Sequence, residues 1–180
     1  DVTDAFEKQK GNLPRKPTTV SFRQIVVATK PNPAARAAAL AKAESLQVEA
    51  GAKGADFEKI AKRESMDPGS KDVGGDLGWN RRGRMVPEFD QMMFALPPGV
   101  VSPVVETSLG FHVIKVDRRQ SAEVKARHIL IMPKLDSADL ARAHLVADTV
   151  LRLWKAGTPF DSLVARYHDN AELKGIPEGI

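Results

Sequence analysis

The chain has 180 residues, of which 42% are hydrophobic and 28% are charged, and its formal net charge is +4. This composition is typical of globular domains, and the length suffices for one sizeable core or two small ones. No apolar run approaches the ~18–20 residues of a membrane span. Cysteine is absent, which excludes disulfides, thiolate nucleophiles and soft metal sites from this sequence. Basic and acidic residues are interspersed, so the sequence predicts no nucleic-acid binding.

The N-terminal segment, residues 1–19, is predicted to be a linker or an arm from a preceding module. Gly11, Pro14 and Pro17 interrupt any helix in this stretch. In the following stretch, Val20–Ala28, a strand would direct Phe22, Gln24 and Val26 to one face and Arg23, Ile25 and Val27 to the other. We expect it to be the first strand of the fold.

Three helices are predicted after this strand. Asn32 is a good N-cap, and the residues from Ala34 to Ala50 are strong helix formers. Asp56 is predicted to cap a second helix over residues 57–64. A third helix begins at Pro87, and its apolar stripe follows helical spacing with Phe89, Met92, Met93 and Leu96.

The remaining segments of this unit predict a loop and two extended stretches. Residues 66–83 contain five glycines and are predicted to be a loop. Residues 100–106 are predicted to be extended, and residues 111–117 to be a strand. A β-α-α-α-β-β order, with the helices grouped between the strands, predicts an α+β fold with an antiparallel sheet.

The pattern then begins again. Residues 124–131 repeat the strand pattern of residues 20–27, and a helix is predicted over residues 138–155. Gly157–Phe160 repeats Gly54–Phe57. The offsets agree, since position 128 follows position 24 by 104 residues and position 160 follows position 57 by 103.

The second copy has no counterpart of the glycine-rich loop, the third helix or the last two strands. A half-domain cannot bury its own apolar strand and helix faces. Three outcomes are therefore expected for residues 121–180: partial disorder, packing on the first domain, or completion by another molecule.

Several stretches of the first unit resemble the parvulin (rotamase) family of peptidyl-prolyl isomerases. They are Gly74-Gly-Asp-Leu-Gly-Trp79, then Gly83-x-Met85-x-x-x-Phe89, then Gly110-Phe-His-Val-Ile-Lys115, together with the helix from Phe57. The resemblance implies a parvulin-like fold, with a four-stranded antiparallel sheet and about four helices. It implies a rotamase domain at residues 20–120 and a truncated second copy at residues 121–180. Two copies behind an arm resemble the SurA-like periplasmic chaperones and foldases.

The resemblance also implies the site. A proline pocket would be built from Leu77, Met85 and Phe89, and a polar cluster would contain Asp67, Thr107 and His112. Most members have a histidine on the first strand, where this sequence has Gln24. An amide cannot take up the charge of an imidazole, so Gln24 predicts a lowered activity. His128 occupies the matching position in the second copy, where we expect it to be structural.

The expected function is isomerisation of Xaa-Pro bonds in proline-containing peptides and unfolded client proteins, by a non-covalent mechanism. No cofactor or metal is expected, because the four histidines lack short ligand spacing. Membrane insertion is not expected, because no apolar run is long enough for it. Phospho-specificity is not expected either, because phospho-selective parvulins carry a basic cluster in the loop after the first strand, and the loop Thr29–Pro33 is short and has one lysine. The alternative function is a catalytically weak rotamase that binds client peptides as a chaperone module. The resemblance places the parent protein in the periplasm or another extracytoplasmic compartment.

Overall fold

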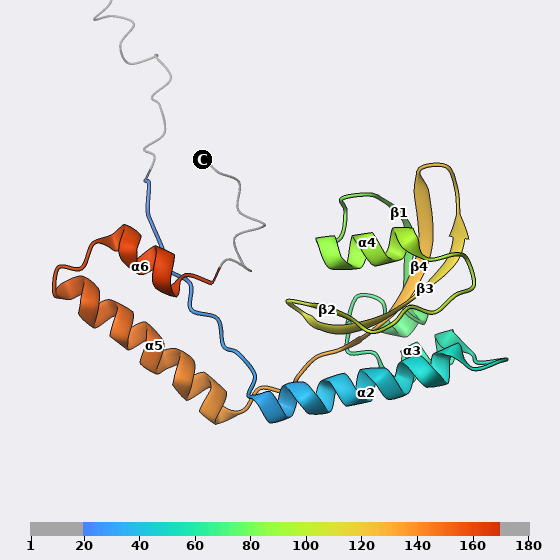
Figure 1. Cartoon of the computed structure of the whole chain (residues 1–180), viewed down its shortest axis with the longest axis horizontal. Helices are drawn as coiled ribbons and strands as arrows, with labels where there is room; N and C mark the ends of the chain where they lie inside the picture. The colour runs from blue at the N-terminus through green and yellow to red at the C-terminus, as the bar shows by residue number, and fades with distance from the viewer. Residues whose placement is uncertain (1–19, 170–180) are drawn as a thin grey trace, which may run out of the picture.

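A four-stranded antiparallel sheet organises the chain, in a computed structural model that describes residues 20–169 (Figure 1). The arm expected at residues 1–19 lies outside the described residues. The strand order is β1-β4-β3-β2. The strands and helices in chain order are α2 (Pro33–Gly51), α3 (Phe57–Glu64), the 3₁₀ turn η2 (Lys71–Val73), β1 (Asp76–Arg81), α4 (Pro87–Ala95), β2 (Val105–Thr107), β3 (Gly110–Arg119), β4 (Glu123–Ile131), α5 (Ser137–Lys155) and α6 (Phe160–Tyr167).

Helices cover both faces of the sheet, and each face has its own apolar core. On one face α2 and α3 pack against alternate strand residues, namely Phe111, Val113, Ile129 and Ile131. On the other face α4 packs against the intervening residues, namely Ile114, Val116, Val124 and Ala126. The period of two along a strand produces this division, and it sets the side of the sheet on which each polar residue lies.

The helices follow the sequence prediction closely because local signals fix their ends. The Asn32 side chain accepts a hydrogen bond from the N–H of Ala35 at 2.8 Å, and Asp56 accepts one from Lys59 at 3.1 Å. Both bonds satisfy N–H groups that a helix start leaves without an intrahelical partner. The α+β class and the antiparallel sheet are confirmed.

The segment 20–28 differs from its prediction, because it forms no strand. Its place at the centre of the sheet is taken by β4, between β1 and β3. The expected loop at residues 66–83 also contains a strand, β1, which pairs with β4 through a bulge between Asp76 and Trp79. The glycines around β1 concealed it, because glycine-rich stretches usually indicate turns.

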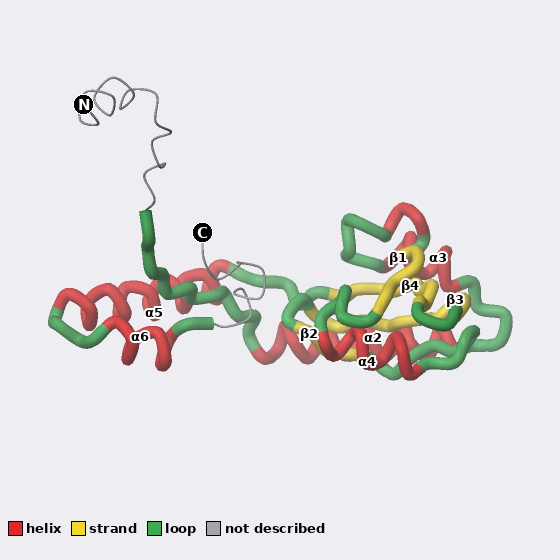
Figure 2. The backbone as a smooth tube through the Cα atoms, turned by 90° about the horizontal axis from the view of Figure 1, so that it is seen from above, coloured by secondary structure: helices red, strands yellow, loops and turns green. Residues whose placement is uncertain are grey.

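The segment 20–28 lies instead beside α5 and α6, in a lobe apart from the sheet. In Figure 1 this segment is the blue stretch that runs along α6 towards the start of α2. Figure 2 shows α5 and α6 at one end of the molecule and the sheet at the other. The N–H of Asp169, just after α6, donates to the carbonyl of Val26 at 2.9 Å. We refer to residues 20–30 with α5 and α6 as the helical lobe.

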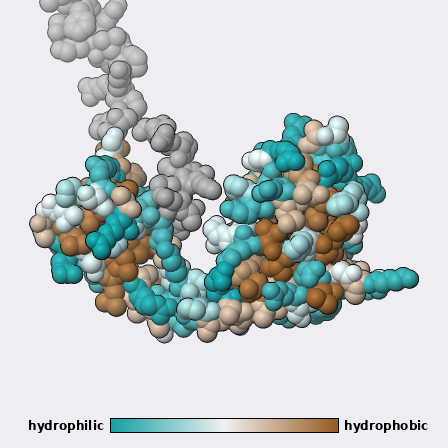
Figure 3. All heavy atoms as spheres, viewed as in Figure 1, coloured by the Kyte–Doolittle hydropathy of each residue, from teal (hydrophilic) through white to brown (hydrophobic). Residues whose placement is uncertain are grey.

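The helical lobe carries apolar side chains on its surface. Figure 3 shows brown patches over α5 and α6. The large exposed apolar residues in this lobe include Phe22, Leu140, Leu145, Leu151 and Trp154. Between residues 20 and 169, no helix is both long and apolar enough to cross a membrane.

Candidate functional site

A chain of hydrogen bonds joins side chains from four segments on the α4 face of the sheet. Thr107 Oγ1 lies 2.8 Å from His112 Nε2, and His112 Nδ1 lies 3.2 Å from His128 Nδ1. His128 Nε2 in turn lies 2.8 Å from Asp67 Oδ2. We call Thr107, His112, His128 and Asp67 the polar relay. Thr107 comes from β2, His112 from β3, His128 from β4, and Asp67 from the loop after α3.

The geometry of the relay fixes the tautomers of both histidines. Asp67 is a carboxylate, so His128 Nε2 carries the proton and donates it. The other nitrogen of neutral His128 must then accept a hydrogen bond from the Nδ1–H of His112. His112 Nε2 is consequently an acceptor for the hydroxyl proton of Thr107. The Thr107 oxygen also accepts from the N–H of Leu109 at 3.1 Å, which holds the hydroxyl in place.

Strand register brings the two histidines together. In the β3–β4 ladder Ile114 is opposite His128 and His112 is opposite Leu130, so the histidines are diagonal neighbours on one face. A close backbone contact with Gly75 fixes the position of β4 at His128. The N–H of His128 donates to the Gly75 carbonyl at 2.9 Å. A Cβ on Gly75 would lie 2.2 Å from the His128 carbonyl oxygen, so only glycine fits there.

Asp67 is held in its position by short-range hydrogen bonds. Its carboxylate accepts from the hydroxyl of Ser70 and from the N–H of Gly69 at 3.1 Å. Burial favours the neutral carboxyl, but the bonds from Ser70, His128 and Gly69 outweigh it and lower the pKa of Asp67. Asp67 is therefore ionised at neutral pH, as its role of acceptor from His128 requires.

Both histidines are buried and neutral. His112 is 3% exposed and His128 is 7% exposed. Burial, reinforced by the neighbouring His128, lowers the pKa of His112 to about 4. Burial also lowers the pKa of His128, although Asp67 opposes this shift. The edge of the Phe89 ring packs against both imidazoles, at centroid distances of 5.2 and 5.5 Å.

Of the expected proline-pocket residues, Phe89 contacts the relay directly, and Leu77 and Met85 pack against the core that contains it. Phe89 is buried in the core under α4, and Leu77 and Met85 pack against that core while remaining partly exposed. Leu77 comes from β1 and Met85 from the loop before α4. An apolar surface thus borders a buried polar chain, which is an arrangement common in binding sites for small groups.

Gln24 does not belong to this cluster, although the sequence comparison with parvulins placed it there. Gln24 is exposed and lies on the segment beside α6. His128, which we expected to be structural, occupies the position that the resemblance assigns to the first-strand histidine. The sequence did contain this signal, because His128 is the residue that matches position 24 in the repeat. It could not show which of the two strands enters the sheet.

Ser70 lies beside a histidine of the relay, but it does not have the geometry of an activated nucleophile. Its Oγ lies 3.0 Å from the same His128 Nε2 that meets Asp67, whereas a base that activates a serine uses its second nitrogen for the orienting carboxylate. Ser70 is also 3% exposed and donates to Asp67. Among the described residues, no three potential ligands of the His, Asp and Glu types gather to hold a metal ion.

Comparison with known proteins identifies the family. The family model described as the PPIC-type PPIase domain matches residues 7–120. This match includes the segment 20–28 and ends before β4. The foldase protein PrsA of Geobacillus kaustophilus is 50% identical over 68 residues, which cover 38% of this chain and 24% of that protein. The chaperone SurA of Nitrosospira multiformis is 36% identical over 121 residues, covering 67% of this chain and 24% of that protein.

One solved structure is also similar to this chain. The peptidylprolyl isomerase PrsA from Bacillus anthracis has 25% sequence identity and a TM-score of 0.39, with 70% of this chain and 52% of that chain covered. The chain spans about a quarter of the length of the PrsA relatives that it matches. Because the family model covers more than half of the chain, this chain belongs to the family of the PPIC-type peptidyl-prolyl isomerase (parvulin) domain.

Proposed function

We propose that the chain isomerises Xaa-Pro bonds of unfolded client proteins without forming a covalent intermediate. The observation that supports this most directly is the polar relay beside the apolar side chains of Leu77, Met85 and Phe89. We assign substrate binding to these three apolar residues. The polar cluster of the site is the relay, which consists of Asp67, Thr107, His112 and His128.

The chemistry of the reaction suits an apolar pocket. Rotation about a peptide bond crosses a barrier of roughly 18–20 kcal/mol, which amide resonance imposes. No bond to carbon breaks, so neither a nucleophile nor a metal is needed. The twisted amide has less charge separation than the planar amide, and water-poor surroundings therefore disfavour the planar ground state. Binding that is tighter in the twisted state accelerates the reaction.

The relay contributes position rather than proton transfer. Its two imidazoles are neutral near pH 7, and each of their nitrogens is engaged within the chain of hydrogen bonds. A buried, fully bonded network is rigid. It fixes the orientation of Asp67 at one end and of Thr107 at the other, beside the bound prolyl group.

The relatives guide the choice of substrate. One is a foldase and another a chaperone, so the proposed substrates are extended segments of unfolded proteins in an extracytoplasmic compartment. We propose no requirement for phosphoserine or phosphothreonine. Lys30 pairs with Asp169 at 2.7 Å, and Arg36 pairs with Glu106 at 2.6 Å. These two cations of the segment around residue 30 are thus already neutralised by carboxylates.

A protease-free cis/trans assay on a series of Xaa-Pro peptides tests the proposal. We expect acceleration by the wild type, and a loss of about 10- to 100-fold in kcat/KM for Met85→Ala, since an apolar contact is worth about 1–3 kcal/mol. Met92→Ala is the matched control, because Met92 packs against the same core and we assign it to packing alone. A folded wild type that does not accelerate isomerisation would refute the proposed enzymatic activity.

The assay also decides between isomerase and peptide-binding module. A wild type that suppresses client aggregation but accelerates no Xaa-Pro peptide would support the chaperone function. Glutamine at position 24, where most parvulins have histidine, does not favour that alternative, because Gln24 lies away from the relay. The exposed apolar side chains of the helical lobe would provide a surface for binding unfolded clients in either case.

A further inference from the structure

The helical lobe matches the first half of the sheet domain element by element. Helices α2 and α5 each have 19 residues, and α5 begins 104 residues after α2 (137 against 33). Helices α3 and α6 each have 8 residues, and α6 begins 103 residues later (160 against 57). We infer that the two repeats have exchanged their first strands: β4 of the second repeat completes the first, and segment 20–28 of the first packs on the second.

Backbone hydrogen bonds are reciprocal in this exchange. After α3, the N–H of Met66 donates to the carbonyl of Leu130 at 2.8 Å, and after α6 the N–H of Asp169 donates to that of Val26 at 2.9 Å. Asp169 follows Met66 by 103 residues, and Leu130 follows Val26 by 104. Each repeat therefore bonds the end of its second helix to the strand of the other repeat, at the same residue of that strand.

Side-chain contacts repeat the same relationship. The N–H of Leu130 donates to the Ser65 hydroxyl at 3.2 Å, and the N–H of Val26 donates to His168 Nδ1 at 3.0 Å. His168 is the counterpart of Ser65. These residues differ in type but occupy equal positions and accept equivalent bonds.

Two ion pairs also correspond. Arg127 of β4 pairs with Glu58 of α3 at 3.5 Å, and Arg23 pairs with Asp161 of α6. Position 127 matches position 23, and position 161 matches position 58. In both lobes an arginine of the incoming strand thus meets the acid at the second residue of the short helix.

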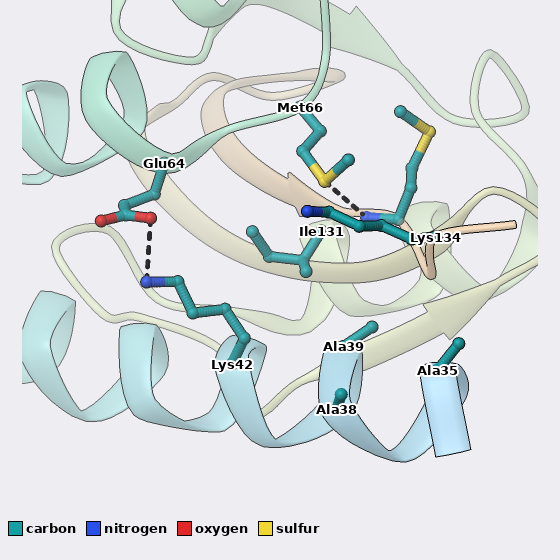
Figure 4. A pocket seen from close by; sticks show the side chains of 9 residues that line it. Ala35, Ala38, Ala39, Lys42, Glu64, Met66, Ile131 and Lys134 are labelled. Carbon is teal, nitrogen blue, oxygen red and sulfur yellow. Dashed lines mark hydrogen bonds and ion pairs between the residues drawn. The ribbon is translucent and has the colours of Figure 1, made fainter. Parts of the chain in front are cut away.

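The cavities of the two lobes correspond as well. Figure 4 shows a cavity of about 530 Å³ between α2 and the end of β4, on the sheet face opposite the relay. A smaller cavity lies between α5 and the segment 27–30. Eight of the nine residues that line the first cavity, all but Glu64, match the eight that line the second at offsets of 103 or 104. Ala39, Met66 and Ile131 of the first, for example, match Ala143, Asp169 and Val27 of the second.

The two linkers meet where the strands change lobes. Asn32 caps α2 and Asp136 caps α5, and the two caps are 104 residues apart. The Asn32 side-chain amide donates to Asp136 Oδ2 at 3.1 Å. One linker joins segment 20–28 of the helical lobe to α2, and the other joins β4 of the sheet to α5, so this contact marks the crossing point of the exchange.

The exchange decides the composition of the site. With β4 in the sheet, His128 completes the polar relay. With segment 20–28 in the sheet, Gln24 would stand at that position and the link between His112 and Asp67 would lack its imidazole. The first rotamase unit therefore takes one of its site residues from the second repeat.

Engineered disulfides test this inference on the whole chain, which has no cysteine of its own. Trp79 is opposite Lys125 in the β1–β4 ladder, a separation within the range a disulfide spans. Ser21 is the residue of the first strand that matches Lys125. We compare Trp79→Cys with Lys125→Cys against Trp79→Cys with Ser21→Cys, oxidising both folded proteins and mapping the bridges by mass spectrometry.

The exchanged arrangement predicts a bridge within one chain for the Lys125 variant, at least about tenfold more abundant than for the Ser21 variant. A dominant bridge in the Ser21 variant would overturn the inference. Bridges between two chains in the Lys125 variant would overturn it too, since the exchange would then be intermolecular. If the Trp79 variants fail to fold, Asn80→Cys with Val124→Cys against Asn80→Cys with Val20→Cys makes the same comparison. The readout needs no activity, so it stands apart from the proposed function.

Discussion

The Nδ1 atoms of His112 and His128 face each other at 3.2 Å, with the two rings nearly parallel. A single proton fits between these nitrogens, so the pair cannot carry two imidazolium charges in this arrangement. The pair links Asp67, which bonds to His128 of β4, to Thr107 of β2, which bonds to His112 of β3. The integrity of the site therefore depends on the neutral state of both rings and on the strand that supplies His128.

Substitution of His128 tests its place in the site. We expect His128→Gln to lower kcat/KM about 10- to 100-fold, because it leaves buried partners in the network without a hydrogen bond, at a cost of about 1–3 kcal/mol each. Gln24→His is the matched control and should change kcat/KM by less than about twofold, since surface substitutions are usually near neutral. The reverse result, with gain of activity in Gln24→His and no loss in His128→Gln, would place Gln24 in the site.

The stability of the protein should fall as the pH drops from neutral towards 4. The pKa of His112 is about 4 in the folded chain and 6.5 in the unfolded chain, so between these values the unfolded state binds more protons. The contribution of neutral His112 to the unfolding free energy is fully present above pH 6.5. It is lost as the pH falls from 6.5 through the folded pKa of about 4. The loss should be on the order of a few kcal/mol. The lowered pKa of His128 has the same sign.

Urea unfolding at pH 7.5, 6, 5 and 4.5 measures this dependence. The exposed His144 on α5 supplies a control, because His144→Gln should keep the pH dependence of the wild type. An unfolding free energy that stays constant down to pH 4.5 would contradict the assigned burial of the histidine pair.

Thr107 should be needed for its hydroxyl and not for its shape. Thr107→Val leaves His112 Nε2 buried without a donor, which costs about 1–3 kcal/mol in unfolding free energy. Thr107→Ser retains the hydroxyl and should regain most of the stability and of kcat/KM. Chemical denaturation together with the isomerase assay reports both effects. A Thr107→Val variant as stable and active as the wild type, beside a Thr107→Ser variant that is impaired, would assign the role to the methyl group instead.

Gly75 should be irreplaceable because β4 passes directly against it. Gly75→Ala adds a methyl group 2.2 Å from the His128 carbonyl oxygen, at a φ of +77°. It should lower the unfolding free energy by about 3 kcal/mol. Gly78→Ala is the control, because Gly78 has a φ of +68° but open space around it. It should cost only about 1–2 kcal/mol. Thermal unfolding of both variants makes the comparison, and similar losses would mean that the contact with β4 is not tight.

The sequence by itself determined the helices and the class of fold, and it pointed to most residues of the proposed site. Asn32, Asp56 and Pro87 mark helix starts through local hydrogen bonds and fixed φ angles, which need no tertiary context. The glycine and aromatic pattern from Gly74 to Phe89 identified the family, and the resemblance also predicted Asp67, Thr107 and His112 as members of one polar cluster. The sequence also showed the repeat at offsets of 103 and 104.

Only the tertiary structure decided which strand enters the sheet. Residues 20–27 and 124–131 carry equivalent alternating patterns, so local preference does not distinguish them. Chain connectivity does, because β3 and β4 are joined by the three residues Gln120–Ala122 and close a hairpin at low entropic cost. Segment 20–28 would have to reach β3 across more than 80 intervening residues, as the bounds of β3 at Gly110–Arg119 imply. The short loop brings His128, rather than Gln24, to the side of His112.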